Sequence, residues 1–175
     1  MRRILNNTQK QLAVIILAAG KGTRMNSDLP KVLHPIGGLP MITRVVRTAQ
    51  ALQANHIVPV LGYKYELVQS ALKDDSVECA LQLEQLGTAH AVLQCRNILK
   101  DFRGNVLILY GDVPLIKVET LANLLSLHNE TDTKSTILTT DLPDPTGYGR
   151  IIRNNDHSLM KIVEEKDATN EERKV

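Results

Sequence analysis

The fold is decided by one stretch of the sequence, Leu12-Ala13-Val14-Ile15-Ile16-Leu17-Ala18-Ala19-Gly20-Lys21-Gly22-Thr23-Arg24. Residues 12–19 are all apolar and include several β-branched side chains, and a glycine closes the run. A short, continuous apolar run of this kind is typical of a strand buried on both faces, as the strands of parallel sheets are. The stretch therefore predicts a central strand of a parallel sheet, followed directly by a glycine-rich loop.

Strand-like and helix-like segments alternate along the rest of the chain. We expect further strands at the apolar runs 56–61, 77–83, 105–110 and 136–140, and two short strands within 150–163 around Asn155-Asp156. Apolar residues recur at helical spacing over 41–54, 65–73, 88–99 and 118–128, which predicts helices there. The alternation predicts an α/β fold with a mostly parallel sheet. Residues 1–11 are polar, so we expect a loose arm there, before one domain over 12–175.

The composition is that of an ordinary soluble domain. Apolar residues make up 43% and charged residues 23% of the 175 residues, which argues against a disordered chain. The net charge is only +2, and the chain has one Phe, four Tyr and no Trp. Neither a basic surface nor a platform for stacking bases therefore indicates a nucleic-acid partner. No run approaches the roughly 18 apolar residues of a membrane span, so we expect no membrane partner.

Two features bear on the cellular compartment. Basic residues near the N-terminus precede the apolar run 12–19, as in a signal peptide, but the run is short and no clear cleavage site follows. Cys79 and Cys95 lack metal-ligand spacing and are too few for a disulfide framework. We therefore expect free thiols and a cytoplasmic location.

The loop after residues 12–19 is the first candidate for a binding site, because ligands of such sheets bind beyond the carboxyl ends of the strands. Its glycines would let backbone amides approach phosphate oxygens, and Lys21 and Arg24 add positive charge. The loop lacks the Gly-Lys-Ser/Thr ending of a Walker A loop, and Met25 stands where a dinucleotide fingerprint has its third Gly or Ala. On these residues alone, a phosphate loop and a plain glycine-rich turn both stay open.

Two charged residues are expected near the same edge of the sheet. Lys31 lies in the long loop 20–38, and Asp112 follows the apolar run 105–110 closely. A carboxylate there could hold Mg²⁺, which binds one or two carboxylates together with phosphate oxygens and waters. A lysine could contact a phosphate as a point charge. The alternatives are a solvated lysine and an aspartate that caps the turn before Pro114.

Three further elements are weak signals by themselves. Gln82 and the loop at Gly87 and Thr88 belong to the third expected strand and the segment after it, where Thr88 could simply cap the next helix. The segment 147–149 could be only a hairpin turn, and Glu164 begins a charged segment that is otherwise expected to be solvated.

Six strings in order resemble one enzyme family. They are Leu17-Ala18-Ala19-Gly20-Lys21-Gly22-Thr23-Arg24-Met25, Leu29-Pro30-Lys31-Val32-Leu33, Gln85-Leu86-Gly87-Thr88-Ala89-His90-Ala91, Tyr110-Gly111-Asp112-Val113-Pro114-Leu115, Asp144-Pro145-Thr146-Gly147-Tyr148-Gly149-Arg150-Ile151 and Val163-Glu164-Glu165-Lys166-Asp167-Ala168. The beginning resembles the signature of the sugar-phosphate nucleotidyltransferases. Together, from about Leu12 to the last residue, they resemble the uridylyltransferase domain of the bifunctional N-acetylglucosamine-1-phosphate uridylyltransferase/glucosamine-1-phosphate acetyltransferases. The resemblance implies a Rossmann-like three-layer nucleotidyltransferase fold.

The implied reaction transfers UMP from UTP to N-acetylglucosamine 1-phosphate, giving UDP-N-acetylglucosamine and pyrophosphate for cell-envelope precursor synthesis. In the family's pattern Arg24 and Lys31 are the implied catalytic residues, which steady the triphosphate and contact its phosphates. Gln82 with Gly87 and Thr88 would hold and select the uracil. The residues that would contact the uridine nucleotide are Leu17, Ala18, Ala19 and Gly20.

The resemblance also implies a metal and a sugar site. Asp112 would be a ligand of Mg²⁺, the implied cofactor, and Tyr110 and Gly111 would line the sugar side. Gly149 and Glu164 would hold the N-acetylglucosamine moiety. The attacking phosphate is already an anion, so the reaction needs no general base.

The resemblance extends beyond this sequence. Family members continue with further strands of the same domain, a later Asn that completes the metal site, and a left-handed β-helix that carries acetyltransferase activity and trimerisation. We therefore expect a nucleotidyltransferase domain without its C-terminal part, in which self-association is possible and a trimer needs the β-helix. His34 and His90 are expected to be structural. Two alternatives stay open: a sister enzyme that uses another base or sugar, and a catalytically incomplete nucleotide-binding fragment.

Overall fold

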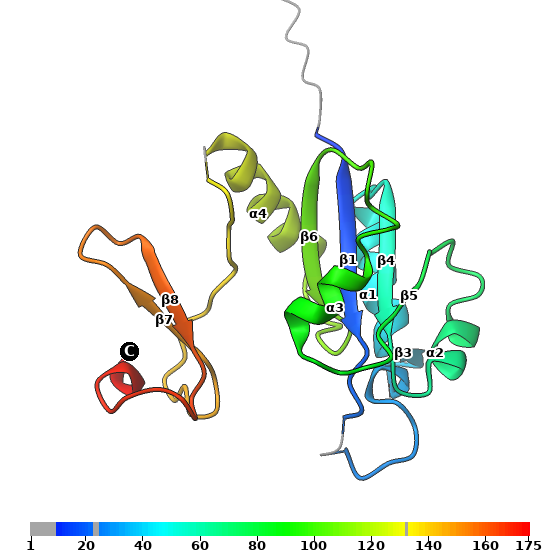
Figure 1. The fold of residues 1–175 in the computed structure, drawn as a ribbon, viewed down its shortest axis with the longest axis horizontal. Coiled ribbons are helices and arrows are strands. Elements are labelled where there is room, and N and C mark those ends of the chain that lie inside the picture. The colour runs from blue at the N-terminus through cyan, green and yellow to red at the C-terminus, as the bar shows by residue number, and fades with distance from the viewer. Residues whose placement is uncertain (1–9, 23–24, 132) are drawn as a thin grey trace, which may run out of the picture. The chain divides into compact units, whose positions relative to one another are not determined.

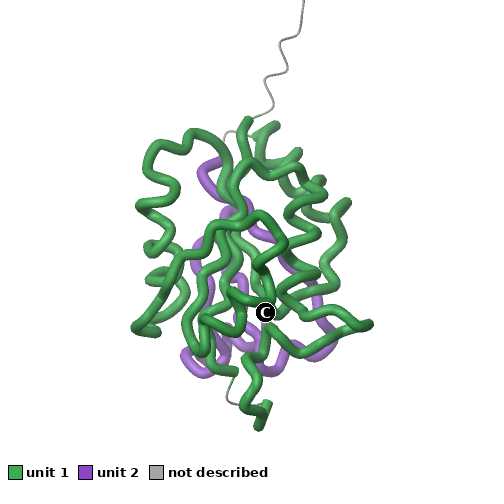
Figure 2. The backbone as a smooth tube through the Cα atoms, turned by 90° about the vertical axis from the view of Figure 1, so that its right-hand side faces the viewer, with its two compact units in different colours: residues 1–132 green, residues 133–175 purple. Residues whose placement is uncertain are grey.

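The computed structural model describes residues 10–22, 25–131 and 133–175. The chain divides into two compact units, residues 1–132 and residues 133–175, which are green and purple in Figure 2. Unit 1 contains a four-stranded sheet with its helices, and unit 2 contains one hairpin with its flanking loops. Most of the expected arm, residues 1–11, lies outside the described residues.

The sheet of unit 1 is parallel throughout, and its spatial order is β5-β4-β1-β6 (Figure 1). The strands are β1 (Leu12–Ala18), β4 (His56–Leu61), β5 (Ala80–Leu81) and β6 (Asn105–Tyr110). The chain first extends the sheet from β1 through β4 to β5, and then returns to place β6 on the free side of β1. The carboxyl ends of β1 and β6 therefore flank the topological switch point, where ligands of such sheets bind.

Helices cover both faces of this sheet. Successive side chains of β1 point to opposite sides, so each face of the strand packs against different helices. They are α1 (Met41–Ala51), α2 (Tyr65–Ala71), α3 (Thr88–Gln94) and α4 (Val118–Glu130). Val14 belongs to a core formed with α1, α2 and α4, and Ile15 belongs to a second core formed with α3. The three-layer α/β fold is thus confirmed. No helix in the described ranges is long and apolar enough to cross a bilayer.

The second core also contains the buried thiol of Cys95, which is free, as is that of Cys79. Burial raises the pKa of the Cys95 thiol to about 11, so this side chain is protonated and packs as a small apolar group.

Short elements shape the long loop that follows β1. They are the 3₁₀ turn η2 (Lys31–Leu33) and the two-residue strands β2 (Pro35–Ile36) and β3 (Leu39–Pro40), which pair antiparallel. The N–H of Met41 donates to the carbonyl of His34, which joins the start of α1 to the end of η2. This hydrogen bond holds η2, and with it the backbone of Lys31, against the start of α1.

Several elements end earlier than the sequence predicts. α1 ends at Ala51 rather than at residue 54, because Gln53 takes a left-handed φ of 56°. Tight turns follow α3 over 95–100 in place of the helix expected to residue 99. The strand expected over 77–83 is only Ala80–Leu81. Leu83 is 79% exposed, so lengthening β5 towards it would bury little.

Unit 2 contains the antiparallel hairpin of β7 (Arg150–Arg153) and β8 (Leu159–Val163), which confirms the two short strands expected around Asn155-Asp156. A 3₁₀ turn, η3 (Glu172–Lys174), follows. The strand expected over 136–140 is wrong, because these residues join no sheet of the described structure. β-Branched residues favour a strand only where a neighbouring strand can take up the backbone hydrogen bonds.

Candidate active site

A pocket of about 610 Å³ lies at the carboxyl edge of the sheet in unit 1. Ten of the residues predicted from the sequence line it: Leu17, Ala18, Ala19, Gly20, Lys31, Gln82, Gly87, Thr88, Tyr110 and Asp112. They come from the ends of β1 and β6, from η2, and from the segment that joins β5 to α3. The fold therefore brings together residues that are up to 95 positions apart, between Leu17 and Asp112.

Lys31 and Asp112 form an ion pair in this pocket. The Lys31 Nζ lies 2.7 Å from the Asp112 Oδ2, and the two side chains are 39% and 34% exposed. An ion pair at this exposure contributes at most about 1 kcal/mol to stability. Either partner can therefore exchange the other for a phosphate oxygen or a metal ion at little cost. The fold therefore places the residues predicted for the phosphate and the metal beside each other.

Two glycines shape this charged corner. Gly22 has a φ of 63°, and a Cβ added to it would lie 2.7 Å from the Lys31 Cβ. The loop can therefore lie against the Lys31 side chain only because residue 22 has no side chain of its own. Gly111 donates its N–H to the Leu17 carbonyl at 2.9 Å, and its added Cβ would lie 3.2 Å from the Ala18 Cβ. Gly111 is buried against β1 and does not line the pocket, whereas Tyr110 before it does.

Gln82 also lines the pocket and is buried, with 4% of its surface exposed. Its Nε2 donates to the Gly87 carbonyl at 3.0 Å and lies 3.0 Å from the His90 Nδ1. Gly87 has a φ of 98° and is itself the N-cap of α3, and Thr88 is the first helical residue. The alternative in which Thr88 caps the helix is therefore wrong. The Gln82 side-chain amide is therefore held against the start of α3, where it lines the pocket.

Two further residues, which the sequence did not indicate, position this part of the pocket. The Gln85 Nε2 donates to the Ala19 carbonyl at 2.9 Å, which ties the loop before α3 to the end of β1. Gly62 follows β4, and its added Cβ would lie 2.7 Å from the Ala19 carbonyl oxygen and 3.0 Å from the Gln82 carbonyl oxygen. Glycine thus permits the three chain segments to meet. Gln85 begins one of the six strings and Gly62 stands in none of them, and neither residue type by itself indicates such a contact in the sequence.

In unit 2, the hairpin brings together the two predicted sugar residues. Arg150 pairs with Val163 in the ladder, which sets Gly149 across from Glu164. A Cβ added to Gly149 would lie 3.4 Å from the Val163 carbonyl oxygen and 4.0 Å from the Glu164 Oε2. A glycine at this position therefore leaves the space beside the Glu164 carboxylate open.

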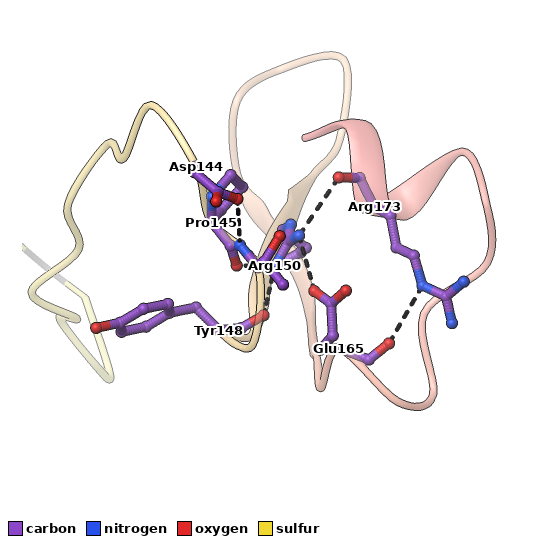
Figure 3. A network of polar contacts seen from close by, with 7 residues as sticks. Asp144, Pro145, Tyr148, Arg150, Glu165 and Arg173 are labelled. Atoms are coloured by element: carbon purple, nitrogen blue, oxygen red, sulfur yellow. Dashed lines mark hydrogen bonds and ion pairs between the residues drawn. The ribbon is translucent and has the colours of Figure 1, made fainter.

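Arg150 is the centre of a buried polar network in unit 2, shown in Figure 3. Its side chain is 5% exposed, and its Nη2 lies 2.8 Å from the Glu165 Oε2. Its Nη1 donates to the Pro145 carbonyl at 2.9 Å and to the Tyr148 carbonyl. Its Nη2 is also 3.4 Å from the Arg173 carbonyl. One guanidinium therefore joins the loop before β7 to the segment after β8, which are the two segments that carry Gly149 and Glu164.

The same loop begins with an aspartate turn. The Asp144 Oδ1 accepts the Thr146 N–H at 3.1 Å. Hydrogen bonds from Thr146 lower the pKa of the Asp144 carboxyl, so the turn is made with the ionised side chain.

A family model describes most of this chain. Residues 14–161 match the MobA-like NTP transferase domain, where NTP is a nucleoside triphosphate.

The chain belongs to this family of NTP transferase domains.

Known relatives of this NTP transferase domain bear out the resemblance drawn from the six strings. The chain is 53% identical over 161 residues to the bifunctional protein GlmU of Streptococcus uberis, which covers 92% of this chain and 35% of that protein. It is 48% identical over 164 residues to the bifunctional protein GlmU of a Picosynechococcus species, covering 93% of this chain and 36% of that protein. The chain thus spans about a third of the length of these relatives.

Solved structures with the same fold are more distant in sequence. HddC from Yersinia pseudotuberculosis superposes with a TM-score of 0.62 at 22% identity, covering 87% of this chain and 69% of that one. A Bacillus anthracis protein, described as a candidate glucose-1-phosphate thymidylyltransferase and solved with sucrose, gives a TM-score of 0.63 at 23% identity, covering 88% and 64%. At these identities the likeness concerns the fold, which is the implied nucleotidyltransferase fold.

Two predicted features of this NTP transferase domain need separate mention. Arg24 lies outside the described residues. Among residues 10–22, 25–131 and 133–175, no group of three or more His, Cys, Asp and Glu side chains could form a metal cage. The pocket instead offers the single carboxylate of Asp112 beside space for a ligand.

Proposed function

We propose that this chain binds UTP in the pocket of unit 1 and transfers UMP to N-acetylglucosamine 1-phosphate, giving UDP-N-acetylglucosamine and pyrophosphate. One observation carries the proposal: the loop after β1, Lys31, Gln82 and Asp112 line a single pocket at the switch point of the sheet. The identity of about half to GlmU proteins over more than nine-tenths of the chain supports the choice of substrates. We place the reaction in the cytoplasm, in the synthesis of cell-envelope precursors.

The chemistry is an in-line displacement at the α-phosphorus of UTP. An oxygen of the sugar 1-phosphate forms the new P–O bond, and the bond to pyrophosphate breaks, so the bonding electrons leave with pyrophosphate. The protein has to position the groups and neutralise the charge on the phosphate oxygens. Lys31 and the backbone amides of the loop at Gly20 are the described groups placed to do this.

The Asp112 carboxylate fits the role of a Mg²⁺ ligand. Mg²⁺ binds oxygen, accepts one or two carboxylates, and completes its shell with phosphate oxygens and waters. A single carboxylate that is 34% exposed and paired only to a half-exposed lysine meets this requirement without a metal cage. The bound ion would neutralise charge on the triphosphate, and Lys31 would then be released toward the phosphates.

The base and the sugar would be held by separate parts of the chain. Uracil would lie against Gln82, Gly87 and Thr88, where a buried amide suits the imide edge of the base. The sugar would be held by Gly149 and Glu164 of the hairpin, which lie side by side in unit 2.

Nucleotide binding with little turnover is the second candidate function. It is favoured by the single carboxylate, that of Asp112, which the described residues bring to the pocket as a metal ligand. Self-association of the chain is also possible under either function, because the edge strand β6 carries exposed apolar side chains at Val106 and Ile108.

Pyrophosphate release by the 175-residue chain with UTP, N-acetylglucosamine 1-phosphate and Mg²⁺ tests the proposal, together with calorimetric titration of UTP. We expect saturable UTP binding and a sugar product that requires both substrates. UTP binding without product supports the second candidate, and a failure to bind any nucleoside triphosphate refutes both.

A further inference from the structure

The orientation of a side-chain amide decides which nucleobase can form hydrogen bonds with it. Its nitrogen carries two protons and its oxygen only accepts, so rotating the amide by 180° exchanges a donor for an acceptor. The carbonyl oxygen of Gly87 can only accept, and it lies 3.0 Å from the Gln82 Nε2. The Gln82 nitrogen must therefore face Gly87, which uses one of its two protons.

The second proton of this nitrogen points to a ring nitrogen. The His90 Nδ1 lies 3.0 Å from the same Gln82 Nε2. This contact is a hydrogen bond only if Nδ1 carries no proton, and a neutral imidazole then carries its proton on Nε2. The pocket is lined by Gln82 but not by His90, so the histidine acts on a ligand only through the glutamine.

The other side of the ring faces a second amide nitrogen. The Gln94 Nε2 lies 3.0 Å from the His90 Nε2 and donates at 3.0 Å to the His90 carbonyl, one helical turn back along α3. A neutral imidazole has one unprotonated nitrogen, so it can accept from only one of the two amides. Gln94 is half-buried and has the His90 carbonyl as a second acceptor, whereas Gln82 is 4% exposed and held by Gly87. We therefore assign the acceptor to Nδ1 and the proton to Nε2, with the Gln94 side chain shifting away from the ring.

We propose that His90 is a positioning residue that sets the base preference of the pocket. By engaging the second Gln82 proton, it leaves only the Gln82 Oε1 to meet a base. That oxygen accepts the N3–H of uracil and repels the unprotonated N3 of cytosine, so the nucleotide is selected by a histidine that does not touch it. This inference rests on the proposed uridine nucleotide and corrects the expectation that His90 is merely structural.

Matched substitutions separate positioning from packing. Asn at position 90 keeps an acceptor at the place of Nδ1, and Leu has a similar shape without one. Calorimetric titration of UTP and CTP against the 175-residue chain should show a preference for UTP that His90→Leu lowers at least about tenfold, because the second Gln82 proton is then free to donate to the N3 of cytosine. His90→Asn should restore the preference to within about threefold of the wild type.

Coupling to Gln82 provides the internal control. In a Gln82→Leu background, His90→Leu should change the UTP-to-CTP ratio no further, because the group that it positions is gone. An unchanged ratio in His90→Leu, or an equal loss in His90→Asn, overturns the proposal. Wild-type chain that binds both nucleotides equally overturns it as well, while a chain that binds neither refutes the proposed function itself.

The protonation site of the ring provides a test that needs no nucleotide. Long-range ¹H–¹⁵N correlation spectra of the wild-type chain distinguish the two neutral tautomers of His90. We expect the proton on Nε2 and a change in the Nδ1 signal in Gln82→Leu. A proton on Nδ1 overturns the proposal even where nucleotide binding is too weak to titrate.

Discussion

Replacing Arg150 by Met should loosen unit 2 at its centre. Met retains much of the apolar stem of the side chain but removes its charge and all its donors. Arg150 is 5% exposed and lies 2.8 Å from a Glu165 carboxylate that is 31% exposed. The substitution leaves that carboxylate partly buried without its partner, and it also removes the donors to the Pro145 and Tyr148 carbonyls.

The magnitude follows from this burial. Removing one partner of a buried ion pair costs about 3–5 kcal/mol. Glu165 keeps some contact with water, which places the expected cost near the lower limit, at about 3 kcal/mol. Since about 1.4 kcal/mol corresponds to a factor of ten, opening of this region should become more frequent on the order of 100-fold.

Hydrogen exchange followed by mass spectrometry measures that opening locally. Peptides over 144–150 and 163–173 should lose protection in Arg150→Met, while a peptide over β1 should not change. Arg153→Met is the matched control, because Arg153 is exposed and donates only to the His157 carbonyl among the contacts described for it. Protection of 144–150 that changes less than about threefold, or that falls equally in the control, refutes the reasoning.

The same substitution should separate the two substrates of the proposed reaction. Gly149 and Glu164 belong to the segments that Arg150 joins, whereas the nucleotide residues belong to unit 1. We expect the KM for N-acetylglucosamine 1-phosphate to rise and the Kd for UTP to stay unchanged. A weaker affinity for UTP in Arg150→Met would contradict this separation.

Three further changes have expected outcomes. Asp112→Asn should lower Mg²⁺-dependent pyrophosphate release by more than about tenfold, because a metal-held phosphate contact is lost. Gly22→Ala should weaken UTP binding in calorimetry, because its Cβ would lie 2.7 Å from the Lys31 Cβ. A hydrogen bond from Lys161, with others from Thr169, lowers the pKa of Glu172 to about 2. A depressed carboxyl pKa contributes stability above its unfolded value of 4.5 that is lost as the pH falls towards 2, so urea unfolding of Glu172→Gln should be less pH-dependent there.

Controls make these three outcomes decisive. Gly38→Ala matches Gly22→Ala, because Gly38 also has a positive φ, of 80°, but nothing lies within 4 Å of its added Cβ. Equal effects of the two glycine changes would mean that backbone strain, not the lysine stem, is responsible. Asp112→Asn should retain the wild-type circular dichroism and UTP-free melting curve, and turnover within about tenfold of wild type would remove Asp112 from the site. Parallel pH curves for Glu172→Gln and wild type would contradict the assigned hydrogen bonds.

The central sheet could be predicted because its strands are decided locally. The runs that became β4 and β6 have the bounds that the sequence predicts, because both are nearly continuous apolar runs, although β6 exposes Val106 and Ile108 on one face. The run 136–140, which contains three Thr with Ile137 and Leu138, is also rich in strand-forming residues but has no partner strand in the described structure. Pairing is a tertiary property, and composition alone does not report it.

The sequence predicted those site residues whose side chains are charged or polar and also come after the carboxyl end of a strand. Lys31 and Asp112 each follow from the rule that ligands meet the carboxyl ends of strands, and the fold brings them to 2.7 Å. His90 and Arg150 carry no such signal. Each acts on a neighbour in space, the Gln82 amide in one case and the Pro145 and Tyr148 carbonyls in the other. Both residues stand within the six strings, but the roles that we infer for them follow from hydrogen-bond geometry and not from the strings themselves.

The residues proposed for the nucleotide and those proposed for the sugar are held in place in different ways. The two groups should therefore differ in how well they tolerate substitutions elsewhere in the chain. Of the residues proposed for the nucleotide, those that follow β1 and β6 come after strands joined by one continuous parallel ladder, so the sheet itself sets their spacing. The residues proposed for the sugar lie at the end of a two-stranded hairpin, an element that is marginally stable by itself in water. Such a hairpin needs additional contacts to hold Gly149 and Glu164 in place, and the buried guanidinium of Arg150 provides them. Substitutions remote from any ligand should therefore reduce sugar recognition more readily in unit 2 than nucleotide recognition in unit 1.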